Sequence, residues 1–96
     1  MEFDWNNPAF PVGSSLNLKE VEESFEDPFA IRLLPDSPRF AVQARFFNLG
    51  MSIGGTGIFS VYRTNGKQIR VIMARLFEPD ERRFYERKLT QNLNGL

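Results

Sequence analysis

The sequence predicts a single α+β domain, an antiparallel sheet of about four strands with a short N-terminal helix and a C-terminal helix packed on it. Two observations carry this prediction. Polar and apolar residues alternate through residues 57–76 on both sides of Asn65-Gly66, which is typical of a β-hairpin. Apolar residues then recur at helical spacing in residues 79–89, as they do earlier in residues 17–27. A chain of 96 residues can bury one modest core.

The N-terminal part is expected to hold a short strand, a loop and a helix. Residues 2–5 are interpreted as the first strand. Residues 6–15 are interpreted as a loop because they include two prolines, a glycine and two serines. Asn17 and Glu20 resemble a capping box that begins the helix, and Pro28 ends it. The acidic residues of this helix are expected to form its solvated face, with contact to a basic partner as the alternative.

The middle of the chain is expected to add two strands. Residues 29–34 form the first of them, closed by a turn over residues 35–38 that contains two prolines. Residues 39–49 form a longer strand with apolar residues on both faces. Residues 51–57 contain three glycines but lack the lysine, the spacing and the following helix of a phosphate-binding loop. We therefore interpret them as a hairpin connection.

The hairpin that follows sets the predicted position of two arginines. Asn65-Gly66 predicts a two-residue type I′ turn, because that turn needs positive φ at both central residues. In the resulting register Val61 opposes Arg70, so Arg63 and Arg70 are diagonal neighbours on one face. The remaining residues of that face are Phe59, Val61, Gln68, Ile72 and Ala74. The other face is expected to be nearly all apolar and to hold Ile58, Ser60, Tyr62, Ile69, Val71 and Met73.

Arginines gathered on one sheet face raise the question of what anion they bind. A phosphate between the guanidinium groups of Arg63 and Arg70 is one answer, with Lys67 at the hairpin tip as a further contact. The alternative is that Arg63 is solvated while Arg70 pairs with a carboxylate. Arg75 lies an odd number of residues from Arg70, so the two share a face only if a bulge intervenes or Arg75 turns at the strand end.

The C-terminal helix is expected to begin at Pro79, a residue favoured at the first helical position, and to end near Leu89. Residues 90–96 are polar and are expected to fray. The apolar side of the helix and its approach should dock on the sheet through Phe77, Phe84, Tyr85 and Leu89.

Composition excludes several classes of site. The chain contains no cysteine and no histidine, so it has no disulfide, no thiolate nucleophile and neither of the commonest zinc ligands. We expect no metal and no cofactor. Twelve basic and twelve acidic residues leave no net charge, so any RNA binding has to be local. No signal peptide and no membrane-length apolar run is present, which favours a cytosolic protein without membrane association.

Several short motifs follow one another along the chain, over roughly residues 2 to 87. Those near the C-terminus consist of Ile69, Arg70, Ile72, Ala74, Arg75, Glu81, Arg82, Tyr85 and Glu86. Those upstream are Phe3-Asp4-Trp5, Phe25-x-Asp27-Pro28, and Arg45-Phe46 with Gly50 and Ser52. In order and spacing these motifs resemble the BrnT family, the toxin half of a bacterial type II toxin–antitoxin pair.

The resemblance implies a RelE-like ribonuclease that is held inactive by a small ribbon-helix-helix antitoxin, BrnA-like, which also binds operator DNA. It points to Arg45, Arg70 and Arg75 as the catalytic arginines. The chain departs from the family pattern at Gly13 and Ser14, which stand where the family carries lysine and histidine. Ala44 also stands where a glutamate often precedes the arginine matched by Arg45. These departures imply weakened or lost ribonuclease activity.

Three functional hypotheses therefore remain open. The first is a BrnT-like toxin, the second a non-catalytic interaction module of the same fold, and the third an unrelated small α+β binding domain. The remaining proton acceptors for an RNase reaction are a carboxylate or Tyr85, and Tyr85 is expected to pack in the core. Ten phenylalanines predict apolar surface covered by a partner, either the antitoxin or a second copy of the chain.

Overall fold

The computed structural model describes residues 2–4, 16–33 and 45–94. The predicted loop at residues 6–15, including Gly13 and Ser14, lies outside this part, as does the predicted turn at residues 35–38. The α+β class is confirmed: the described elements are β1 (Glu2–Phe3), α1 (Leu18–Glu26), β2 (Ile31–Leu33), β3 (Phe46–Met51), β4 (Gly57–Thr64), β5 (Gln68–Leu76) and α2 (Pro79–Asn94).

The described strands form one five-stranded mixed sheet in the order β1-β5-β4-β3-β2. The prediction of about four antiparallel strands is therefore corrected. β1 lies within the strand predicted at residues 2–5, but it pairs parallel to β5 with Phe3 beside Ile69, which makes the sheet mixed. Phe3 makes an edge contact with Phe25 of α1, with ring centroids 5.4 Å apart. This aromatic contact holds β1 at the sheet edge, because a two-residue strand makes few backbone bonds of its own.

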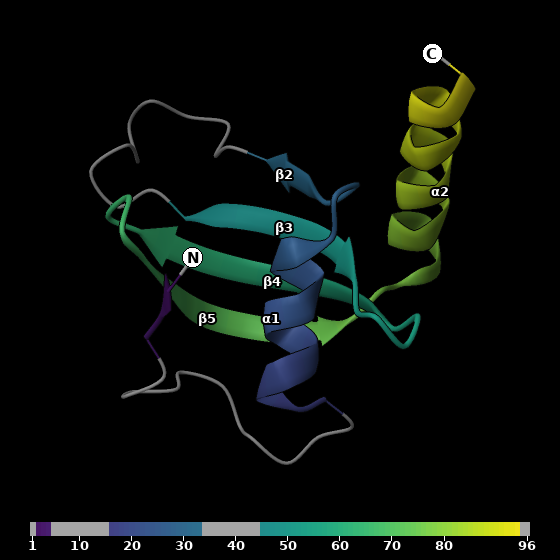
Figure 1. Cartoon of the computed structure of the whole chain (residues 1–96). Helices are drawn as coiled ribbons and strands as arrows, with labels where there is room; N and C mark the ends of the chain where they lie inside the picture. The colour runs from purple at the N-terminus through teal and green to yellow at the C-terminus, as the bar shows by residue number, and fades with distance from the viewer. Residues whose placement is uncertain (1, 5–15, 34–44, 95–96) are drawn as a thin grey trace.

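α1 crosses one face of the sheet (Figure 1). The predicted cap is confirmed, since the Asn17 side chain accepts a hydrogen bond from the Glu20 N–H at 2.8 Å. The helix buries its apolar side against the sheet, and the resulting core cluster consists of Val21, Phe25, Tyr62, Ile69 and Val71. At Gly50 the helix comes so close that an added Cβ would lie 1.9 Å from the Ser24 carbonyl oxygen.

The predicted hairpin exists, but its turn and register differ from the prediction. Arg63 pairs directly with Arg70, and Thr64 pairs with Ile69. Among the described residues only glycines have positive φ, so Asn65 does not adopt the conformation that a type I′ turn requires. Instead the Asn65 side chain accepts hydrogen bonds from the N–H groups of Lys67 and Gln68. This side-chain cap lengthens the turn and shifts the pairing.

A β-bulge changes which residues share a face. Val61 pairs with Met73 while Tyr62 pairs with Val71, so Ile72 is an extra residue on β5. Met73 consequently lies on the face away from α1, and Ala74 packs against the core cluster beneath the helix. The predicted places of these two residues are therefore exchanged, because sequence alternation alone cannot reveal a bulge.

α2 stands at the end of the sheet away from the Asn65-Gly66 hairpin (Figure 1). It begins at Pro79 as predicted but continues to Asn94, past the predicted end near Leu89. Tyr85 is buried, as expected, and its ring lies 5.6 Å from the ring of Phe77. Phe77 covers Gly57, where an added Cβ would meet its ring at 2.2 Å. Phe84 and Leu89 are only half-buried.

Candidate anion site at the hairpin end of the sheet

The sheet face away from α1 places two arginines side by side. Arg63 of β4 and Arg70 of β5 are direct cross-strand partners, closer than the diagonal relation predicted from the sequence. Like charges directly opposite each other destabilise a sheet. Both residues are exposed. The pair therefore needs a compensating anion, either from the protein or from a ligand.

Arg45 lies at the same end of the sheet. It directly precedes Phe46, which pairs with Tyr62, and Arg63 directly follows Tyr62. Arg45 is also exposed. We call Arg45, Arg63 and Arg70 the arginine cluster, since Arg63 and Arg70 lie on neighbouring strands and Arg45 directly precedes the next strand, β3, at the same level of the sheet.

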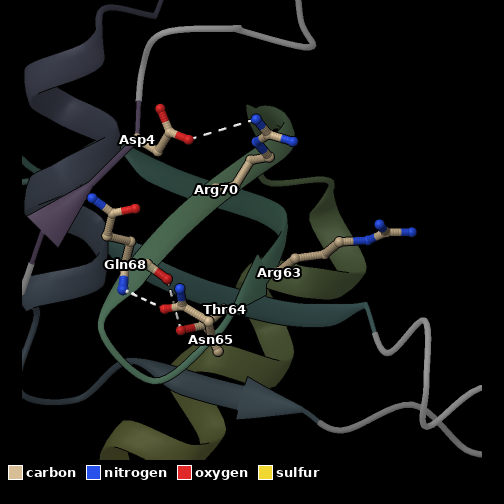
Figure 2. Close-up of a pocket in the computed structure, with 6 residues that line it drawn as sticks. All are labelled: Asp4, Arg63, Thr64, Asn65, Gln68 and Arg70. Carbon is tan, nitrogen blue, oxygen red and sulfur yellow. Dashed lines mark hydrogen bonds and ion pairs between the residues drawn. The ribbon is translucent and has the colours of Figure 1, made fainter.

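A surface pocket of about 300 Å³ lies at this end, lined by Asp4, Arg63, Thr64, Asn65, Gln68 and Arg70. The Asp4 carboxylate lies 3.5 Å from the Arg70 guanidinium. Figure 2 shows these two side chains facing each other, whereas Arg63 extends away from them. The side chain of Arg70 is 50% exposed and that of Asp4 is 22% exposed. Arg70 thus pairs with a carboxylate, as the alternative interpretation expected, and still faces solvent.

The floor of the pocket is held by hydrogen bonds within the hairpin turn. The Thr64 hydroxyl donates to the Gln68 carbonyl at 2.8 Å and accepts from the Gly66 N–H. Together with the bonds made by Asn65, visible in Figure 2, these contacts fix the turn. Lys67, the other predicted anion contact, is exposed at the tip and does not line the pocket.

Asp4 is the residue of this site that sequence reasoning missed. Its backbone N–H donates to the Ile69 carbonyl at 2.9 Å, which anchors Asp4 beside β5 immediately after β1 ends. The available signal was an acidic residue inside a predicted N-terminal strand. That signal could not identify the neighbour, because the pairing of β1 with β5 joins residues far apart in the chain.

Arg75 shares the face of the other two strand arginines, since the bulge at Ile72 removes the odd spacing that separated it from Arg70. Its guanidinium, however, is engaged in the protein. It donates to both carboxylate oxygens of Glu81 at 2.7 and 2.8 Å. It also lies 4.4 Å from the centroid of the Phe59 ring. Arg75 therefore joins β5 to α2.

In the Arg75–Glu81 ion pair, each partner stabilises the charged form of the other. The hydrogen bond to Glu81 raises the pKa of Arg75, an effect larger than the opposing one of burial. Burial alone would raise the pKa of Glu81. Hydrogen bonds from Arg75 and from the Glu78 N–H, together with the Arg75 charge, outweigh the effect of burial, so the pKa of Glu81 is lowered. Both groups are therefore held in their charged forms.

Tyr85 does not serve as a proton acceptor. It is 3% exposed, and its hydroxyl donates to Oδ2 of Asp27 at 2.5 Å. Burial, the hydrogen bond to Asp27 and the negative charge of that carboxylate all raise the pKa of Tyr85. The hydroxyl thus keeps its proton and lies away from the arginine cluster.

Within residues 2–4, 16–33 and 45–94, no group of three acidic side chains is placed to hold a metal ion. No helix in the same part of the chain combines the length and the apolar character needed to cross a membrane. A scan of protein families gave no match to the chain, and a search of curated proteins gave none either.

Proposed function

We propose that this chain is a BrnT-like toxin component of a type II toxin–antitoxin pair, with a RelE-like fold and an endoribonuclease site at the arginine cluster. The observation that carries the proposal is that Arg45, Arg63 and Arg70 lie at one end of the sheet, where Arg63 and Arg70 line a pocket. Arginine binds phosphate through two parallel hydrogen bonds, and RNA presents a phosphate at every nucleotide.

The proposed role of each arginine follows from its surroundings. Arg70 lines the pocket and is half-exposed, so it stabilises the charge that develops on the phosphoryl oxygens during cleavage. Arg45 and Arg63 bind flanking phosphates. Arg75 has a structural role and joins β5 to α2, because its guanidinium already binds Glu81. The resemblance assigns Arg75 a catalytic role, whereas its contacts favour a structural one.

Two observations favour the second candidate function, a non-catalytic binding module. Arg75, one of the three family arginines, is engaged by Glu81, and the chain has no histidine to move a proton. Both facts favour a non-catalytic module of the same fold that binds an anion or a partner. A ribbon-helix-helix antitoxin is the proposed partner in either case.

Induction of the chain in a naive bacterial host separates the two functions. A toxin arrests growth and degrades cellular RNA, and Arg70→Ala should abolish both effects while the protein stays folded. Arg87→Ala is the matched control, because it removes the same charge from an exposed position on α2. Normal growth with intact RNA in cells expressing the wild-type chain would support the non-catalytic module instead.

A further inference from the structure

The arginine cluster supplies positive charge, but cleavage of RNA also needs a group that takes a proton. The attacking nucleophile is the ribose 2′-hydroxyl, which reacts fastest when a positioned base removes its proton. Histidine is the usual base, and the chain has none. Tyr85 is buried on Asp27. The base must therefore be a carboxylate that reaches the same pocket as Arg70.

The acidic residues of the described chain differ in what they contact. Asp27 accepts hydrogen bonds from Met51 and Tyr85, and Glu81 holds Arg75. Glu78, Asp80 and Glu86 form ion pairs at or near α2, and the glutamates of α1 do not line the pocket. Asp4 is the sole acidic residue among those lining the pocket at the hairpin. Its carboxylate lies 3.5 Å from the Arg70 guanidinium, and its side chain is 22% exposed.

We infer that Asp4 is the general base of this site and accepts the proton of the ribose 2′-hydroxyl. The inference rests on the proposed ribonuclease function. It uses the fact that the 2′-oxygen and the oxygens of the adjacent 3′-phosphate belong to one nucleotide, so groups that contact them must lie close together. Asp4 and Arg70 have that spacing, and the bond from the Asp4 N–H to Ile69 fixes the backbone beside β5.

In the proposed cleavage step a water molecule acts as the general acid. Asp4 takes the 2′-proton as the 2′-oxygen forms a bond to phosphorus. The bond between phosphorus and the 5′-oxygen of the next nucleotide breaks, and a water molecule protonates that leaving oxygen. The hydroxide that remains takes the proton from Asp4, which restores the carboxylate. The products are a 2′,3′-cyclic phosphate and a 5′-hydroxyl. Arg70 neutralises the charge on the phosphoryl oxygens throughout.

The test compares Asp4→Asn with Glu2→Gln, a control that removes the same charge from an exposed residue two positions earlier, in β1 and outside the pocket. Both variants are assayed for cleavage of total bacterial RNA and for binding of a 2′-O-methyl oligonucleotide, which cannot be cleaved. Asp4→Asn should slow cleavage by about 10²–10⁴-fold, the usual contribution of a general base, while binding changes little. Glu2→Gln should cleave at the wild-type rate.

The pH profile of kcat/KM supplies a readout that a structural role would not move. The wild-type rate should fall on the acidic side as one carboxylate takes a proton, and the residual activity of Asp4→Asn should lack that limb. A wild-type profile without an acidic limb would overturn the inference even if Asp4→Asn failed to fold. Wild-type cleavage with equal cleavage by Asp4→Asn would overturn Asp4 as base and leave the ribonuclease function standing. Intact RNA with the wild-type chain would overturn both.

Discussion

At the scale of single residues, Gly50 shows how closely α1 packs on the sheet. A Cβ at this position would lie 1.9 Å from the Ser24 carbonyl oxygen, which belongs to the helix backbone and cannot turn aside. Gly50→Ala should therefore destabilise the protein by about 1–3 kcal/mol or more, the usual cost of overpacking. Gly54→Ala is the control, since its nearest neighbour would be the Ser52 hydroxyl at 3.9 Å. Urea unfolding of both variants measures the difference.

Glu81 is a second residue with a measurable consequence. Its pKa is lowered in the folded protein, so the ion pair contributes stability above the ordinary carboxyl pKa of 4.5 and loses it as pH falls through the folded value. Glu81→Gln should lower stability at neutral pH and flatten the acidic side of the stability curve. A variant that kept the wild-type acidic slope would contradict this account of the Arg75–Glu81 pair.

At the scale of elements, Asp27 connects α1, β3 and α2. Following α1, its carboxylate accepts from Met51 at the end of β3 and from Tyr85 on α2. Tyr85→Phe should cost about 1.5–3 kcal/mol, because a hydrogen bond to a charged acceptor is lost. The pKa of Tyr85 is raised above its ordinary value of 10.0, so wild-type stability should fall above pH 10 by more than that of Tyr85→Phe. Leu93→Ala, at an exposed α2 position, should stay within about 0.5 kcal/mol.

Some elements of the fold could be predicted from the sequence, and others could not. Local signals were sufficient for α1, whose cap and proline act within a few residues, and for the start of α2 at Pro79. The register of the hairpin was wrong because the Asn65 side chain competes for the turn amides. The bulge at Ile72 and the pairing of β1 depend on tertiary packing. For the same reason the proximity of Asp4 to Arg70 could not be predicted from the sequence.

At the scale of the whole molecule, the net charge is zero and the proposed RNA site draws on three arginines at one end of the sheet. RNA binding should therefore depend on salt only weakly. Each phosphate contact to a single strand contributes about 0.7 to the slope of log K against log salt, so three arginines predict a slope near ~2. Arg70→Ala should reduce it by about 0.7. Fluorescence anisotropy with the 2′-O-methyl oligonucleotide measures both, and a much steeper slope would require an extended basic surface elsewhere.

The expected partner chain stays a prediction at this scale. The described part of the molecule exposes a few large apolar side chains in several places, namely Phe29, Leu33, Ile53, Leu76 and Leu93. The two outer strands of the sheet, β1 and β2, are two and three residues long. Such short edges discourage pairing between the sheets of two copies.

Because β1 pairs with β5, the proposed site can form only late in synthesis, after β5 has been made. Residues 2–4 leave the ribosome long before residues 68–70, their neighbours in the finished sheet. Closing so long a loop for two strand residues is a late and slow event, because its entropy cost precedes any contact. The carboxylate and the guanidinium therefore meet only after the hairpin has formed. Under the proposed function, a ribonuclease site that needs both groups is therefore incomplete until the whole sheet has folded.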